Sequence, residues 1–145
     1  MPAVLKPQLL QGVGITVTGG ATPVEARLTQ LGATDGHDVL VHQATQGGRQ
    51  ALDEAWDAIR AHMLPPKKGL IVLIAPPPGD AHAEAARAGL ENLARTLSIE
   101  WARHGIRPVT ILPGSGTDPH ATAELVAFLA SRAGAYYAGC AFTLR

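Results

Sequence analysis

The chain has 145 residues, of which 46% are hydrophobic and 17% charged, and its formal net charge is zero. This composition is typical of a core-forming chain, and we expect residues 1–145 to form one domain. Because positive and negative charges balance, the composition does not indicate binding to nucleic acid or to an acidic membrane surface. No apolar run is as long as a membrane span, the beginning of the chain is a poor signal peptide, and the single Cys140 precludes an internal disulfide. We therefore expect a cytoplasmic protein.

Strand and helix patterns alternate along the first half of the chain. A β-branched run at residues 14–18 ends at two glycines, and residues 21–31 carry apolar side chains at helical spacing. A strand is predicted at residues 38–41, and a helix at 51–63. Residues 69–74 are the most apolar run and show no alternation, which favours a central strand covered on both faces.

The second half continues this alternation. Residues 80–104 form the longest helical pattern, which Asp80 is able to cap and Gly105 to end. A strand is predicted at residues 107–112, a helix at 121–131 and a last strand at 139–144. This order predicts an α/β fold, with a three-layer, Rossmann-like, doubly wound parallel sheet of about five strands.

Several segments stand in the order and spacing of a known family. They are residues 17–20, 88–97, 100–102, 105–107, 113–114, 126–131 and 137–139. These segments resemble the end of the first strand, the long helix, the sixth strand and the last helix and strand of the short-chain dehydrogenases/reductases (SDRs). On this resemblance, the family's second and third strands are missing between Ala33 and Asp38, and the chain is a shortened SDR-like domain.

The family's dinucleotide site uses the motif Thr-Gly-x-x-x-Gly-x-Gly, whose glycines let a pyrophosphate approach a helix N-terminus. Thr18, Gly19 and Gly20 match its start, but the later glycines do not follow at the required spacing. The strand that carries the family's ribose-selecting residue is also missing. The resemblance therefore implies no NAD(P) cofactor, and Thr18, Gly19 and Gly20 are vestigial candidates for binding one.

The resemblance also places the family's catalytic tyrosine, and the lysine four residues after it, at Ala83 and Arg87. A methyl group cannot exchange a proton, and a guanidinium lacks the compact geometry of an ammonium group. No catalytic residue is therefore predicted, and the chain is interpreted as a pseudoenzyme. The alternative is that the chain is an NAD(P)-dependent oxidoreductase. Its site would then be completed by a partner, or Tyr136 or Tyr137 would replace the missing proton donor.

Other residue types give weaker hypotheses. The six histidines show no metal-ligand spacing, and residues 35–38 are interpreted as a polar turn, so no metal site is predicted. A third hypothesis is a small-molecule or anion binder without catalysis. It would use the carboxyl ends of the strands, near residues 19–20, 45–47 and 114–117, where ligands bind in open α/β sheets.

The preferred hypothesis is a partner subunit. SDR proteins commonly form dimers and tetramers, and the segments retained here, 51–63, 80–104 and 121–144, resemble the elements of their interfaces. We therefore expect a homo-oligomer, or a hetero-oligomer with a full-length SDR, through these segments. Close helix contacts are expected at Ala83, Ala86, Arg87 and Ala94, with Ala94 facing outward.

Overall fold

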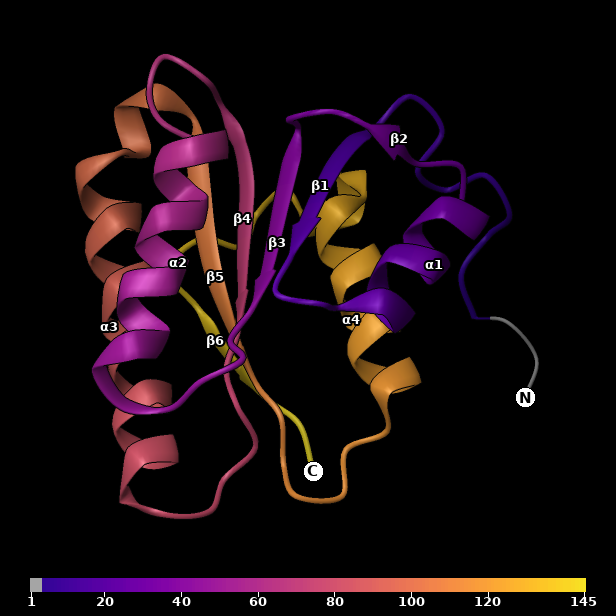
Figure 1. The fold of residues 1–145 in the computed structure, drawn as a ribbon. Coiled ribbons are helices and arrows are strands. Elements are labelled where there is room, and N and C mark those ends of the chain that lie inside the picture. Colours follow the sequence, from indigo (N-terminus) through magenta and orange to yellow (C-terminus); the bar gives the residue numbers. More distant parts are fainter. Residues whose placement is uncertain (1–3) are drawn as a thin grey trace.

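The computed structural model describes residues 4–145 as a parallel sheet of six strands with two helices on each face (Figure 1). The strands are β1 (Gly14–Thr18), β2 (Thr34–Asp35), β3 (Val39–Gln43), β4 (Gly69–Ile74), β5 (Ile106–Leu112) and β6 (Ala141–Thr143). The helices are α1 (Thr22–Gln30), α2 (Gly48–His62), α3 (Ala81–Glu100) and α4 (Pro119–Ala130), with short 3₁₀ turns at Ala102–His104 and Arg132–Gly134. The strand order is β2-β1-β3-β4-β5-β6. The predicted doubly wound α/β fold is confirmed.

The prediction that β4 is a central strand is also confirmed. Leu70, Val72 and Ile74 pack into the core beneath α1 and α4. Ile71 and Leu73 point to the opposite face, into the core beneath α2 and α3. A strand covered on both faces needs apolar residues at every position, which is why its sequence does not alternate.

The sheet contains one strand that the sequence did not predict. The two-residue β2 lies in the segment before Asp38 that was expected to contain no strand, and it pairs with β1 through Gly14 and Thr34. Gly14 and Gly36 approach so closely that a Cβ atom on Gly36 would stand 2.7 Å from the Cα of Gly14. A strand this short has no periodicity to detect, and only its pairing with β1 defines it.

Two helix boundaries also differ from the predictions. Helix α2 begins at Gly48 and α4 begins at Pro119, both earlier than expected. The predicted helix at 80–104 is α3 followed by a separate 3₁₀ turn. No helix in the described part of the chain combines the length and hydropathy needed to cross a membrane.

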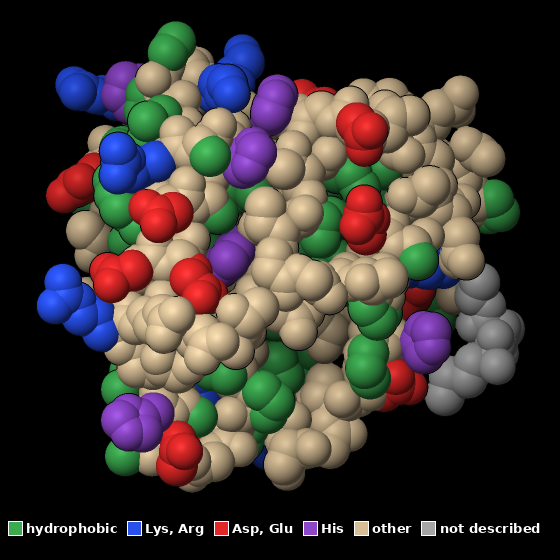
Figure 2. Space-filling view, viewed as in Figure 1, with side chains coloured by type: hydrophobic (Ala, Val, Ile, Leu, Met, Phe, Trp, Pro, Cys, Tyr) green, Lys and Arg blue, Asp and Glu red, His purple; other side chains and the backbone are tan. Residues whose placement is uncertain are grey.

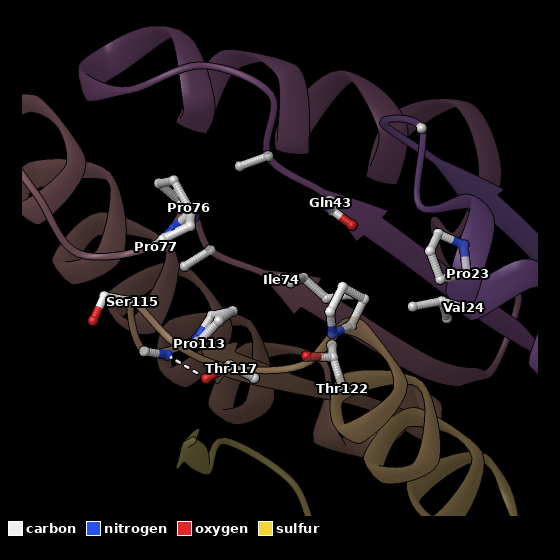
Figure 3. Close-up of a pocket in the computed structure, with 15 residues that line it drawn as sticks. Pro23, Val24, Gln43, Ile74, Pro76, Pro77, Pro113, Ser115, Thr117 and Thr122 are labelled. Atoms are coloured by element: carbon white, nitrogen blue, oxygen red, sulfur yellow. Dashed lines mark hydrogen bonds between the residues drawn. The ribbon is translucent and has the colours of Figure 1, made fainter. Parts of the chain in front are cut away.

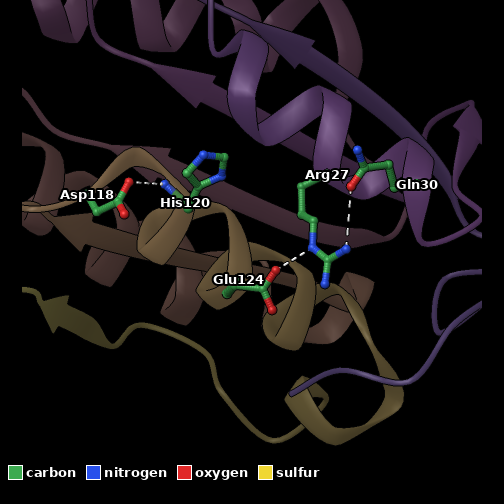
Figure 4. A network of polar contacts seen from close by, with 5 residues as sticks. All are labelled: Arg27, Gln30, Asp118, His120 and Glu124. Carbon is green, nitrogen blue, oxygen red and sulfur yellow. Dashed lines mark hydrogen bonds and ion pairs between the residues drawn. The ribbon is translucent and has the colours of Figure 1, made fainter. Parts of the chain in front are cut away.

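An ion pair joins the two helices on one face of the sheet. Arg27 of α1 donates a hydrogen bond through Nε to the carboxylate of Glu124 of α4, and Gln30 lies beside the same guanidinium (Figure 4). Asp118 caps α4 by accepting a hydrogen bond from the backbone N–H of His120 at 2.9 Å. The Arg27–Glu124 pair therefore joins α1 to α4.

Small side chains bring α2 and α3 together on the other face. Ala55, Ala86 and Ala94 are buried there. The prediction that Ala94 faces outward was wrong, because its side chain is only 1% exposed and packs into the core under the two helices. A charge at Ala94 would therefore destabilise the fold rather than report on assembly.

Candidate functional site

A cavity of about 240 Å³ lies at the carboxyl ends of the strands (Figure 3). The chain passes outward from β1 to β2 and then crosses to β3, so the direction of winding reverses between β1 and β3. Ligands of open α/β sheets bind at such a reversal, outside the carboxyl ends of the strands. The cavity lining comes from the loop after β1, the ends of β3, β4 and β5, and the beginning of α4.

The lining is mostly apolar and contains no ionisable side chain. It is made of Gly20, Pro23, Val24, Gln43, Ala44, Ile74, Ala75, Pro76, Pro77, Pro113, Gly114, Ser115, Thr117, Pro119 and Thr122. Five of these residues are prolines, which have no backbone N–H to donate. Gln43 and Thr122, from β3 and α4, were not predicted as site residues, because no local sequence pattern links the two positions.

The loop after β1 is built for close packing rather than for anion binding. A Cβ atom on Gly19 would stand 1.8 Å from the carbonyl oxygen of Gln43, so this glycine is required by its contact with β3. The backbone N–H of Thr22 is used within the turn, in a 2.8 Å hydrogen bond to Gly20 O. Pro23 then removes a donor from the first turn of α1, and that turn carries the acidic Glu25. Few donors remain here for a phosphate group.

The loop after β5 also forms hydrogen bonds within itself. The backbone N–H of Gly114 donates to the hydroxyl of Thr117 at 2.7 Å, which Figure 3 marks with a dashed line. Thr117 returns its own N–H to Gly114 O. The amides of Gly114 and Thr117, two of those that could have received an anion at residues 114–117, are therefore engaged within the loop.

Ala83 and Arg87, to which the resemblance assigns the family's tyrosine and lysine, lie on the first turns of α3. The backbone N–H of Ala83 donates to the capping carboxylate of Asp80 at 2.9 Å, and its side chain is a methyl group. Arg87 donates through one nitrogen to Pro76 O at 2.9 Å and to Pro113 O at 2.6 Å. The guanidinium therefore ties together the loops after β4 and β5, and it does not line the cavity.

One buried histidine lies next to these loops. His42 of β3 is 5% exposed, and its Nδ1 is 2.8 Å from the hydroxyl of Thr18. Its Nε2 is buried without a hydrogen-bond partner. Burial lowers the pKa of His42, and the nearby carboxylate of Glu54 offsets part of this effect. The histidine is therefore held in its neutral form, and with Thr18 it joins β1 to β3.

Of residues 35–38, which were predicted as a polar turn, Asp35 belongs to β2 and residues 36–38 form the bend before β3. Asp38 accepts a hydrogen bond from the backbone N–H of Gly14 at 2.7 Å. His37 stacks on His62, with ring centroids 6.0 Å apart. Within residues 4–145, the structure contains no group of three or more histidine, cysteine and acidic side chains that could hold a metal ion.

The two tyrosines lie away from the cavity lining. Tyr137 packs between Phe128 and Phe142, with ring centroids 5.9 and 5.5 Å away. Tyr136 is 93% exposed. Neither is placed to donate a proton to a molecule in the cavity.

Comparison with known proteins identifies the fold. No family model matches the chain. A short-chain dehydrogenase from Mycobacterium smegmatis is 19% identical over 99% of this chain and 96% of that one, with a TM-score of 0.77. The citronellol catabolism dehydrogenase of Pseudomonas aeruginosa PAO1 is also 19% identical, over 99% of this chain and 98% of that one, with a TM-score of 0.70. The chain has an SDR-like fold.

A third similar structure contains a dinucleotide. The 3-ketoacyl-(acyl-carrier-protein) reductase of Brucella melitensis, complexed with NADH, is 17% identical over 92% of this chain and 97% of that one, with a TM-score of 0.75. Identities this low establish the fold alone. The cavity at the carboxyl ends of the strands is smaller than the ~300 Å³ at the lower end of ligand pockets. Its lining has five prolines and no cationic side chain, and the amide of Gly114 is used within its own loop. Its residues do not fit a dinucleotide.

Proposed function

We propose that this chain is a catalytically inactive, SDR-like subunit that pairs with a second copy of itself through the outer face of α2 and α3. Loss of activity is supported by the chemistry of the cavity at the carboxyl ends of the strands. Its lining contains no titratable side chain, and Ala83 stands where the family resemblance places the proton donor. Hydride transfer to or from a carbonyl needs a group that exchanges a proton with the oxygen.

The pairing is supported by a hollow between α2 and α3, of about 410 Å³, on the side away from the sheet. Leu52, Trp56, Gly89 and Leu93 supply its apolar lining. Gly89 lets α2 pack closely on α3 beside the hollow, because a Cβ atom there would stand 2.9 Å from the methyl groups of Leu52. Trp56, at the edge of the hollow, is 37% exposed and extends its apolar surface.

A protruding side chain stands on the same stripe of α3 as the hollow. Gly89, Leu93 and Thr96 line the hollow, and Ile99 follows Thr96 at the spacing that keeps residues on one face of a helix. Ile99 is 74% exposed. The pairing is inferred from this single observation. The two subunits of a two-fold dimer use the same surface patch, so a protruding side chain and a hollow on one surface can complement each other. Each Ile99 would enter the hollow of the other copy.

Charge does not oppose such a pair. The formal net charge is zero, so two copies do not repel each other overall. Figure 2 shows acidic and basic side chains scattered over the visible part of the α2 side, with hydrophobic side chains between them. Arg49 and Asp53, for example, pair on the outer turns of α2 at 3.6 Å. The surface therefore has no block of one sign facing its own copy.

Multi-angle light scattering of the wild type and of Ile99→Glu tests the pairing. We expect a dimer for the wild type and a monomer for Ile99→Glu, whose exposed site leaves the fold intact. Tyr136→Glu is the matched control, because Tyr136 is even more exposed and belongs to the other interface candidate, residues 121–144. Both tryptophans, Trp56 and Trp101, lie 6.2 Å apart on this face, so their fluorescence should change on dissociation.

A wild-type monomer, or a dimer broken by Tyr136→Glu and not by Ile99→Glu, would overturn the pairing through α2 and α3. A mixed complex with a full-length SDR, formed by a chain that is monomeric alone, would replace self-pairing with hetero-oligomer formation. Inactivity is tested separately by NADH titration of each species. Saturable NADH binding would refute it and favour the alternative, an oxidoreductase with an atypical or partner-completed site.

A further inference from the structure

Exposed cations gather at the amino ends of β4 and β5, the end of the sheet opposite to the cavity. Lys67 and Lys68 precede β4 and Arg103 precedes β5, and all three side chains are exposed. Within residues 4–145, the ion pairs include none for these three, whereas four arginines of the helices each pair with a carboxylate. Figure 2 shows Lys, Arg and His side chains along the top of the view, where these strands begin in Figure 1.

The fold brings these cations together from two separate segments. The backbone N–H of Gly69 donates to Gly105 O at 3.1 Å, so the residues before β4 lie beside the residues before β5. A Cβ atom on Gly105 would stand 3.4 Å from the Cβ of Lys68, which places the stem of Lys68 against this glycine. Arg103 donates through Nε to His104 Nε2 at 3.3 Å. Lys67, Lys68, Arg103 and His104 are called the basic end below.

Stabilisation of the helix ends accounts for only part of this charge. Helices α2 and α3 end beside the basic end, and the C-terminus of a helix carries a partial negative charge that nearby cations complement. Lys67 has this role, because its Nζ donates to His62 O, in the last turn of α2, at 3.3 Å. Among the hydrogen bonds of residues 4–145, none runs from Lys68 or Arg103 to a backbone carbonyl. These two side chains therefore remain available to a partner.

We propose that the basic end binds an acidic peptide segment of a partner protein. A guanidinium such as that of Arg103 holds a carboxylate through two parallel hydrogen bonds, and each lysine adds an ammonium donor. Leu64 begins the loop that carries the two lysines and is 38% exposed, so an apolar side chain of the peptide has a surface to contact. Several carboxylates near one apolar residue would complement this surface in charge and polarity. The inference does not depend on the pairing through α2 and α3.

The number of cations favours a peptide over a membrane or a nucleic acid. Polybasic segments that bind acidic lipids carry about four to eight lysines and arginines. Proteins that bind nucleic acid tightly neutralise roughly six to ten phosphates. The basic end offers Lys67, Lys68 and Arg103, and Leu64 alone is too small an apolar surface to anchor the protein in lipid. A short segment with a few carboxylates matches this charge.

Fluorescence anisotropy of fluorescein-labelled hexaglutamate, titrated with the full-length chain, tests the proposal. Hexaglutamine should bind at least about tenfold more weakly, because it has the same length and no charge. Lys68→Gln and Arg103→Gln should each weaken hexaglutamate binding by about twofold to fivefold. Glu100 is the acidic residue nearest to Arg103 in the sequence, so Glu100→Gln should strengthen binding by about twofold. Raising NaCl from about 50 to about 500 mM should weaken it, because salt screens exposed charges.

Arg49→Gln is the matched control, because it removes the same charge from a side chain that is 90% exposed in the first turn of α2, at the far end of that helix. It should leave hexaglutamate binding unchanged, and a melting curve shows that each variant has folded. No binding of hexaglutamate, or equal losses in Arg49→Gln and Arg103→Gln, would overturn the proposal. Tighter binding to phosphatidylserine vesicles or to oligothymidylate than to hexaglutamate would also overturn it. Light scattering reports pairing separately, so a failure of pairing is distinguished from a failure of peptide binding.

Discussion

Arg87 is predicted to stabilise the fold rather than to serve a reaction. Its guanidinium joins Pro76 O and Pro113 O, the backbone at the ends of β4 and β5. Hydrogen bonds to a charged group contribute ~1.5–3 kcal/mol each when well shielded. Both bonds come from one nitrogen of a half-buried side chain, so we expect a combined loss of about 2–3 kcal/mol in Arg87→Met. The methionine keeps the apolar stem and removes only the donors.

The assay is urea unfolding followed by circular dichroism, together with a thermal melt. The loss corresponds to a lowering of Tm by roughly 5–10 °C for a chain of this size. Arg95→Met is the control, because Arg95 forms an exposed pair with Glu91 at 3.2 Å, and such pairs contribute below about 0.5 kcal/mol. Equal losses in the two variants would show that the carbonyl contacts of Arg87 do not hold the strand ends together.

Two further predictions concern the loop after β1 and the buried histidine. Gly19→Ala should lower the free energy of unfolding by about 3 kcal/mol or more, because φ is 78° there and the added Cβ would overlap the backbone of Gln43. Gly20→Ala should lower it by only about 1 kcal/mol, because φ is 76° but the space around the residue is open. Equal urea midpoints for the two variants would contradict this reasoning. Burial lowers the pKa of His42, so the unfolded chain takes up its proton first as the pH falls. Stability should therefore decrease below the unfolded-state pKa of about 6.5, by at most about 1.4 kcal/mol per pH unit, and stop decreasing below the folded-state pKa. Urea midpoints of the wild type and His42→Gln between pH 7 and 5 check this, and parallel profiles would show that another group is responsible.

Local sequence patterns predicted most of the fold, because the residues that decide an element lie close together in the chain. The uninterrupted apolar run of β4 and the helical spacing of apolar residues in α1 and α3 each reflect which side chains of that element are buried. The strand β2 was missed for the same reason. It exists through the close approach of Gly14 and Gly36, a contact between backbones that local periodicity does not record.

The candidate site was only half visible in the sequence. Residues 19–20 and 114–117 were predicted to lie at the carboxyl ends of strands, which follows from the order of the elements. The sequence did not show that Gly114 and Thr117 bind each other, or that Gly19 is held against β3. These contacts depend on loop conformation, and in the loop after β5 they turn two possible phosphate donors, the amides of Gly114 and Thr117, into internal hydrogen bonds.

The sequence by itself determined the alternation of strands and helices, and with it the doubly wound sheet. The reason is that the spacing of apolar residues in each element follows from which of its faces is buried. Only the tertiary structure decided which distant side chains meet. It turned Ala94 inward, left Ile99 and the hollow beside Gly89 on one outer surface, and brought Gln43 and Thr122 to opposite walls of one cavity. Such meetings follow from the packing of whole elements on the sheet, and no short segment of the chain contains both partners.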